Sequence, residues 1–153
     1  MKTSQKGIDL IKRSEGLITH AYLCPAGKLT IGWGHTGPDV KKGMTITESQ
    51  AEQLLHKDLN QFASKITYSL EQDHITVNQN QFDALCSFAF NLGYSALVFS
   101  TLWKKLKAGD YTGAADEFLR WVYIKKTVDG EKVKIRQKGL ETRRKAEREL
   151  FLS

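Results

Sequence analysis

The chain has 153 residues, enough for one domain with a substantial hydrophobic core, and we predict a single domain over residues 1–153. Charged residues make up 26% and hydrophobic residues 41%, and no apolar run approaches the roughly 20 residues of a membrane-spanning helix. The first residues lack the continuous apolar stretch of a secretory signal, so we expect synthesis in a cytoplasm and no stable membrane insertion. The net charge of +6 favours polyanionic partners such as nucleic acid, anionic lipid or wall polymers, although a basic surface more often serves solubility.

The N-terminal quarter of the chain predicts a short helix followed by a β-hairpin. Apolar residues around Ile8 to Ile11 have helical spacing, and Gly16 ends the helix. Two short apolar runs, 21–24 and 29–33, flank a Pro-Ala-Gly-Lys turn sequence and are expected to pair as strands. We place this β lobe at about residues 17–45.

The remainder of the chain predicts mainly helices. The capping-box sequence Thr-Glu-Ser-Gln at 47–50 begins a long helix, and the segment 80–93 is apolar on nearly all sides, which indicates a buried central helix. An Asp-Gly pair at 129–130 predicts a second hairpin. Further helices are expected over 95–109, 110–121 and 139–151.

These elements predict an α+β fold, in which a small β-hairpin lobe is inserted after the first helix of a mostly helical body. A cleft between the lobe and the body is the natural place for a functional site. Glu15 lies where the first helix ends, and Cys24 and Thr30 flank the hairpin turn, so these three side chains can converge on such a cleft. Taken singly, each has an ordinary structural explanation, and only their combination and spacing favour a site.

The spacing of Glu15, eight residues, Cys24, five residues and Thr30 resembles the Glu-x8-(Asp or Cys)-x5-Thr pattern of the bacteriophage-type lysozymes, glycoside hydrolase family 24. The similarity continues through nearly the whole chain, in order. It includes the runs 14–16, 21–22, 27–36, 81–93 and 139–151.

This resemblance implies a muramidase that hydrolyses the β-1,4 bond between N-acetylmuramic acid and N-acetylglucosamine in peptidoglycan, for lysis of a phage host. It implies an enzyme without cofactor that is made in the host cytoplasm and acts on the cell wall after release. A separate holin-like protein would then be needed for passage across the membrane, and we expect the lysozyme itself to be a monomer.

The resemblance also implies roles for individual residues. Glu15 would be the general acid, since it is the only carboxylate between Lys12 and Pro38, and Thr30 would orient the attacking water. Family members invert the anomeric configuration. An arginine of the last helix would lie near Glu15, and we favour Arg143 over Arg144.

Cys24 stands where most relatives have an aspartate, and a thiol with an ordinary pKa of about 8.5 is mostly neutral at pH 7. It could position the water together with Thr30, act as a nucleophile, or be only partly needed, and we favour the first role. We also assign Trp33 and Arg143 to substrate binding, with Trp33 stacking on a sugar or simply covering the hairpin.

Three other interpretations remain open. Cys24 with His20 or His35 could form the Cys–His pair of an amidase or endopeptidase. The same three residues could bind a metal ion, but no paired ligand spacing supports this, so we expect no metal. The basic segment 143–148 could bind nucleic acid, although a solvated helix face with interleaved glutamates explains it equally well and we expect no nucleic-acid partner.

Overall fold

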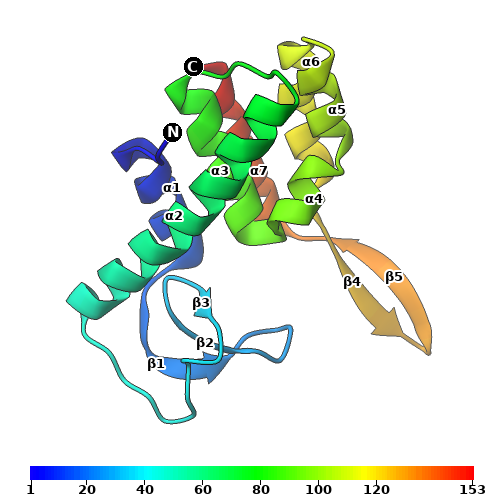
Figure 1. The fold of residues 1–153 in the computed structure, drawn as a ribbon. Coiled ribbons are helices and arrows are strands. Elements are labelled where there is room, and N and C mark those ends of the chain that lie inside the picture. Colours follow the sequence, from blue (N-terminus) through cyan, green and yellow to red (C-terminus); the bar gives the residue numbers. More distant parts are fainter.

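A computed structural model describes all 153 residues and contains seven α-helices, one 3₁₀ helix and five strands. The predicted α+β class is confirmed: a three-stranded lobe lies below a helical body, and a second hairpin projects from the body (Figure 1). No helix combines the length and apolarity that crossing a membrane requires. The elements are α1 (Gln5–Glu15), β1 (Ile18–Leu23), β2 (Leu29–Gly32), β3 (His35–Thr36), α2 (Glu48–Gln72), α3 (Gln79–Leu92), α4 (Tyr94–Val98), α5 (Thr101–Lys107), α6 (Tyr111–Glu117), η1 (Phe118–Arg120), β4 (Tyr123–Val128), β5 (Glu131–Arg136) and α7 (Lys138–Leu152).

The lobe is an antiparallel sheet in the order β1-β2-β3. The predicted hairpin is confirmed, and its turn runs from Cys24 to Lys28, where the Cys24 N–H donates to the Lys28 carbonyl at 2.9 Å. The register pairs Thr30 with Tyr22, so Cys24 lies diagonally from Thr30 rather than directly opposite it. The short third strand, β3, has no separate signal in the sequence. An isolated bridge from His20 to Thr45 closes the lobe near its predicted end.

The predicted central helix is confirmed as α3. Every side chain from Phe82 to Ala89 is buried, and α3 contacts α1, α2, α4 and α7 (Figure 1). A core of 18 buried residues surrounds it. A second core of 9 buried residues lies where the lobe meets α1 and α2, and it fixes the lobe against the body.

The segment predicted as one helix over 95–109 forms two helices, and this prediction is wrong. The Ser100 hydroxyl accepts a hydrogen bond from the Trp103 N–H at 3.1 Å and donates one to the Leu97 carbonyl at 2.6 Å. A serine used in this way begins a new helix, because its side chain satisfies a backbone N–H that has no partner within the helix. The chain therefore breaks between α4 and α5.

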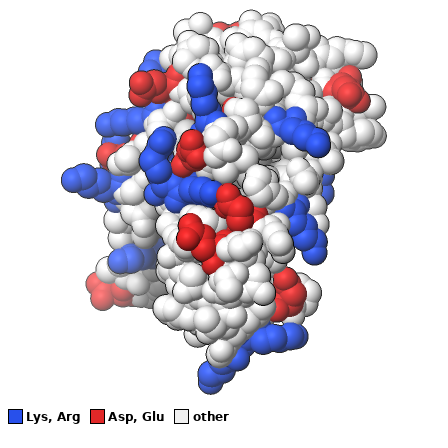
Figure 2. Space-filling view, turned by 90° about the vertical axis from the view of Figure 1, so that its left-hand side faces the viewer, with Lys and Arg blue, Asp and Glu red and all other residues white.

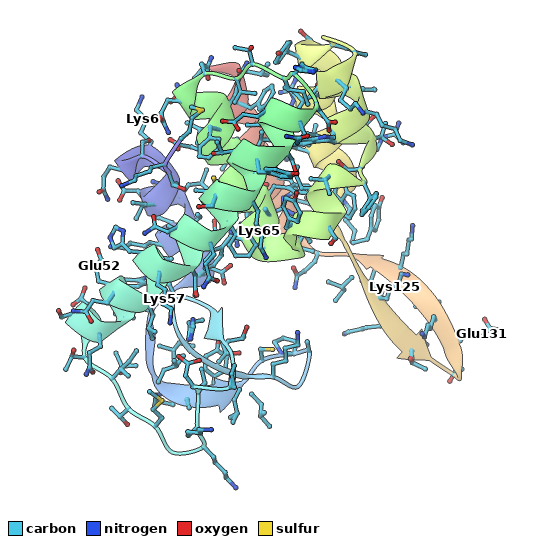
Figure 3. All side chains as sticks on the ribbon, in the orientation of Figure 1. Lys6, Glu52, Lys57, Lys65, Lys125 and Glu131 are labelled. Carbon is cyan, nitrogen blue, oxygen red and sulfur yellow. The ribbon has the colours of Figure 1, made fainter.

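The hairpin of β4 and β5 is also confirmed at its predicted Asp-Gly turn. Asp129 and Gly130 have φ values of +52° and +80°, the left-handed conformations that a tight two-residue hairpin requires. Lys125 and Glu131, labelled in Figure 3, lie on this hairpin away from the helical body. The hairpin ends at Arg136, and Gln137 then leads directly into α7.

Candidate active site

Glu15 is the last residue of α1 and lies at the junction of the lobe and the body. Gly16 ends the helix with a φ of +71°, and its N–H donates to the Lys12 carbonyl at 2.9 Å. The Glu15 side chain is 21% exposed and borders a pocket of about 550 Å³. The residues lining this pocket come from α1, α3 and the segment around the start of α7: Leu10, Arg13, Ser14, Glu15, Asn91, Gln137, Gly139, Leu140, Thr142, Arg143 and Ala146.

The two oxygens of the Glu15 carboxylate face opposite parts of the molecule. Oε1 accepts a hydrogen bond from Arg143 Nη1 at 2.6 Å, across 128 residues of sequence. Oε2 lies against the backbone of Gly34, where a Cβ atom would stand only 2.7 Å from that oxygen. Gly34 also has a φ of +75°, so both its conformation and its contact with Glu15 require glycine. Gly34 was not among the predicted site residues.

Cys24 and Thr30 lie together on the lobe side of Glu15, and neither lines the pocket described above. Thr30 is buried, and its hydroxyl donates to the Lys28 carbonyl at 3.0 Å. Hydrogen bonds from the Lys28 and Ala26 backbone hold the pKa of the Cys24 thiol below its ordinary value.

Tyr22 connects the two halves of the site. It pairs with Thr30, and alternation along β1 places it on the same face of the hairpin as Cys24. Burial raises the pKa of Tyr22, and the nearby negative charges of Glu15 and Cys24 raise it further. The pKa of Tyr22 therefore responds to both Glu15 and Cys24, because both groups lie near this side chain.

Trp33, one of the residues predicted to bind substrate, is buried. Its side chain is buried in the core between the lobe and α2, and Lys12 Nζ lies 4.5 Å from its ring centroid. Lys12 in turn pairs with Glu52 at 2.6 Å, and Glu52 is labelled on α2 in Figure 3. Protein therefore covers most of the indole ring, as expected of a residue that covers the hairpin.

Arg143 occupies the predicted position beside Glu15, but it is buried rather than part of a solvated helix face. Its Nη2 atom donates to the Ser87 carbonyl at 3.2 Å, and its Nε atom lies 3.4 Å from Glu147 Oε2. Ser87 Oγ donates to the same Glu147 oxygen at 2.6 Å. The guanidinium is therefore held from the body side while it contacts Glu15.

Arg144 is also buried and does not contact the Glu15 carboxylate. It pairs with Glu147 at 2.7 Å, donates to Asn91 Oδ1 at 2.9 Å and lies over the Phe88 ring at 5.2 Å. Burial lowers the pKa of Arg144, and the charge of Glu147 opposes this. The interpretation of 143–148 as a solvated basic face is thus wrong for Arg143, Arg144 and Glu147, and the segment offers few free cations to nucleic acid.

Both ring nitrogens of His35 are hydrogen-bonded to carboxylates rather than to Cys24. Its Nδ1 lies 2.7 Å from Asp58 Oδ2 on α2, and its Nε2 lies 2.9 Å from Asp39 Oδ2. Burial alone would lower the pKa of His35, but the hydrogen bonds to Asp58 and Asp39 outweigh it and raise the value. An imidazole held by two carboxylates ties the lobe to α2 and is poorly placed to act as the base of a Cys–His pair.

Charges of both signs are interspersed on the face that carries α1 and the start of α2. Figure 2 shows basic and acidic side chains alternating over this face, with no continuous basic patch. This distribution is typical of a solvated surface and does not favour a nucleic-acid interface there.

Comparisons with known proteins show the family of this chain. A family model described as phage lysozyme matches residues 12–147. The endolysin of Acyrthosiphon pisum secondary endosymbiont phage 1 is 44% identical over 153 residues, which span 100% of this chain and 99% of that protein. The solved endolysin from Escherichia coli O157:H7 phage FAHEc1 has a TM-score of 0.86 at 39% identity, covering 100% of this chain and 94% of the other. The muramidase domain of SpmX from Asticaccaulis excentricus has a TM-score of 0.88 at 34% identity, covering 99% and 98%. The chain therefore belongs to the phage lysozyme family.

Proposed function

We propose that this protein is a muramidase that hydrolyses the β-1,4 bond between N-acetylmuramic acid and N-acetylglucosamine in peptidoglycan, as the lytic enzyme of a phage. The observation that carries the proposal is the Glu15 carboxyl group at the edge of a polar pocket, held between Arg143 and Gly34. The names of its relatives, endolysin and muramidase domain, support the same substrate.

In this proposal Glu15 is the general acid. Hydrolysis breaks the bond between the anomeric carbon and the bridging oxygen, and the Glu15 proton passes to that oxygen as it leaves. Arg143 contacts Oε1, and the backbone of Gly34 lies against Oε2, so the carboxyl group is fixed in direction. Fixing it in this way lowers the entropy cost of aligning acid and leaving group.

Thr30 and Cys24 would direct the water that attacks the anomeric carbon from the opposite face, which gives inversion. The bond from the water oxygen to the anomeric carbon forms as the old bond breaks, and the proton that the water loses passes to the Cys24 thiolate. A Cys24 thiol with a lowered pKa can accept a hydrogen bond from that water more strongly than a neutral thiol can. We assign Cys24 to water positioning rather than to nucleophilic attack.

We also propose where the enzyme is made and how it reaches the cell wall. The enzyme would be made in the host cytoplasm and would reach the wall after a holin-like protein opens the membrane. It would act as a monomer.

The proposal is tested by digesting purified peptidoglycan and measuring which bond is cut. We expect new reducing sugar ends from the wild type and none above background from Glu15→Gln, which preserves the shape of the side chain but carries no acidic proton. New amino groups without reducing ends would instead identify an amidase or endopeptidase and would contradict the proposal.

A further inference from the structure

Glu147 is a fully buried acidic residue next to the pair of Glu15 and Arg143, which we call the catalytic pair. Neither the proposed mechanism nor the Glu-x8-Cys-x5-Thr pattern gives Glu147 a role. Its side chain is 0% exposed and lies one helical turn beyond Arg143 on α7. Arg143, Arg144 and Ser87 all place a donor within 3.4 Å of its oxygens. Burial raises the pKa of Glu147, while the charges of Arg144 and Arg143 counteract this and favour the ionised form.

Arg143 therefore lies between two carboxylates. Nη1 donates to Glu15 on the pocket side, and Nε lies 3.4 Å from Glu147 Oε2 on the buried side without forming a hydrogen bond. Ser87 holds the same arrangement from α3, because its carbonyl accepts from Arg143 and its hydroxyl donates to Glu147. Arg143 is therefore held toward Glu15 by Ser87, and Glu147 supports this arrangement through its hydrogen bond with Ser87 and its charge beside Arg143.

The charges of this cluster must also be balanced. Seen from Glu15, two arginines and one glutamate lie on the body side, which leaves one net positive charge. Without Glu147, Arg143 and Arg144 would present two positive charges in a buried environment, where electrostatic interactions are strong. A catalytic acid must carry a proton, and each additional positive charge nearby favours the loss of that proton.

We propose that Glu147 is a positioning residue for the catalytic pair: it orients the Arg143 guanidinium toward Glu15 and offsets arginine charge so that Glu15 keeps its proton. The inference rests on the proposed role of Glu15 as general acid. Other ionisable groups around Glu15 are Tyr22 and Cys24 on the lobe and Arg13 on its own helix. All three stay in place in the variants below.

The first test is the pH dependence of peptidoglycan hydrolysis by the wild type and Glu147→Gln. Glutamine keeps the size of the side chain and removes one negative charge. We expect the alkaline limb of kcat/KM to move to lower pH by about one unit, the low end of the effect of a neighbouring buried charge. A purely structural role for Glu147 would lower activity by the same factor at every pH, and that result would overturn the inference.

A charge-balanced double variant is the matched control. Arg144→Gln with Glu147→Gln removes one charge of each sign, so Glu15 again faces one net positive charge, and we expect the alkaline limb to return toward its wild-type position. A double variant that keeps the shift of the single variant would contradict the charge argument. Thermal melts of all variants show whether a loss of activity comes from unfolded protein or from a change in the protonation of Glu15.

A second measurement is independent of activity. Carbon-13 NMR can follow the Glu15 carboxyl carbon through a pH titration, with Glu15→Gln identifying its signal. We expect the Glu15 proton to be lost at lower pH in Glu147→Gln than in wild type, and coincident titrations would refute the inference. If the Glu15 titration differs between wild type and Glu147→Gln but the wild type releases no reducing ends, the proposed function fails, while the effect of Glu147 on Glu15 stands.

If Glu147→Gln does not fold, Ser87→Ala tests the same link. It removes the hydroxyl that donates to Glu147 at 2.6 Å and leaves every charged residue present. Losing this bond disfavours the ionised form of Glu147, so the Glu15 titration should move in the same direction by a smaller amount. An unchanged titration in Ser87→Ala would overturn the inference.

Discussion

The ion pair between His35 and Asp58 offers a quantitative test of how the lobe is held to the body. The two side chains are only 8% and 18% exposed and meet at 2.7 Å, which joins β3 to α2. Asp58→Asn keeps the shape of the side chain but removes the charge. The third member of the cluster, Asp39, is 52% exposed, so its own contribution should be small.

The expected cost follows from the burial of this pair. A hydrogen bond to a charged group contributes about 1.5–3 kcal/mol, and breaking a fully buried pair costs more. We therefore expect Asp58→Asn to lower the free energy of unfolding by about 2–3 kcal/mol at pH 5.5. For a protein of this size that change corresponds to a fall in Tm of about 5–10 °C.

The pH dependence has a definite sign. The hydrogen bonds to Asp58 and Asp39 raise the pKa of His35 in the folded protein, against the effect of burial. The stabilisation is therefore fully present below the unfolded-state pKa of about 6.5 and is lost as the pH rises through the higher folded-state pKa. Burial also raises the pKa of Asp58, so this group likewise favours the folded state more at lower pH.

The assay is urea or thermal unfolding of wild type and Asp58→Asn at about pH 5.5 and pH 9. We expect the difference in unfolding free energy to shrink at the higher pH to about 1 kcal/mol, because the ion pair is then lost and the asparagine oxygen can accept the same hydrogen bond from neutral His35. Equal differences at the two pH values, or a difference near zero at pH 5.5, would refute this reasoning.

Three further substitutions, one of them with a matched control, test the site itself. Gly34→Ala places a methyl group against Glu15 Oε2, and we expect kcat to fall about 100-fold, the effect of displacing the carboxyl group by about 1 Å. Gly109→Ala is the control, because Gly109 has the same left-handed backbone conformation but no atom near the added methyl group. We expect Gly109→Ala to lose stability and to keep its specific activity. Equal losses of activity in both variants would show that backbone strain alone is responsible. Cys24→Ser should reduce hydrolysis less than Glu15→Gln does, because a serine hydroxyl can still position water, whereas near-total loss in both would identify Cys24 as a nucleophile. Cys24→Asp should retain hydrolysis, since aspartate is the commoner residue at this position in the family pattern, and an inactive Cys24→Asp would argue against the water-positioning role.

Local signals in the sequence predicted most of the fold. The capping box at Thr47 begins α2 as expected, with Gln50 supplying the reciprocal hydrogen bond. The all-round apolar character of 80–93 identified the central helix, and the Asp-Gly pair identified the second hairpin. Ser100 was a local signal of the same kind, and a serine between two apolar helical segments could have indicated the break between α4 and α5.

The site was less accessible to sequence reasoning because its contacts join distant segments. Glu15 meets Arg143 across 128 residues, and Arg143 meets Ser87 across 56. Nothing in the local pattern shows that Arg143 and Arg144 of a basic helix face inward, where Glu147 offsets part of their charge. The burial of Trp33 beneath Lys12 likewise depends on how the lobe packs against α1 and α2.

Product analysis by mass spectrometry tests the central claim most directly. Purified peptidoglycan is digested with wild type and with Glu15→Gln, and the soluble fragments are identified by mass before and after borohydride reduction. We predict disaccharide–peptide fragments that end in reducing N-acetylmuramic acid from the wild type and their absence from Glu15→Gln. Intact glycan strands from the wild type, or the same fragments from both proteins, would contradict the account.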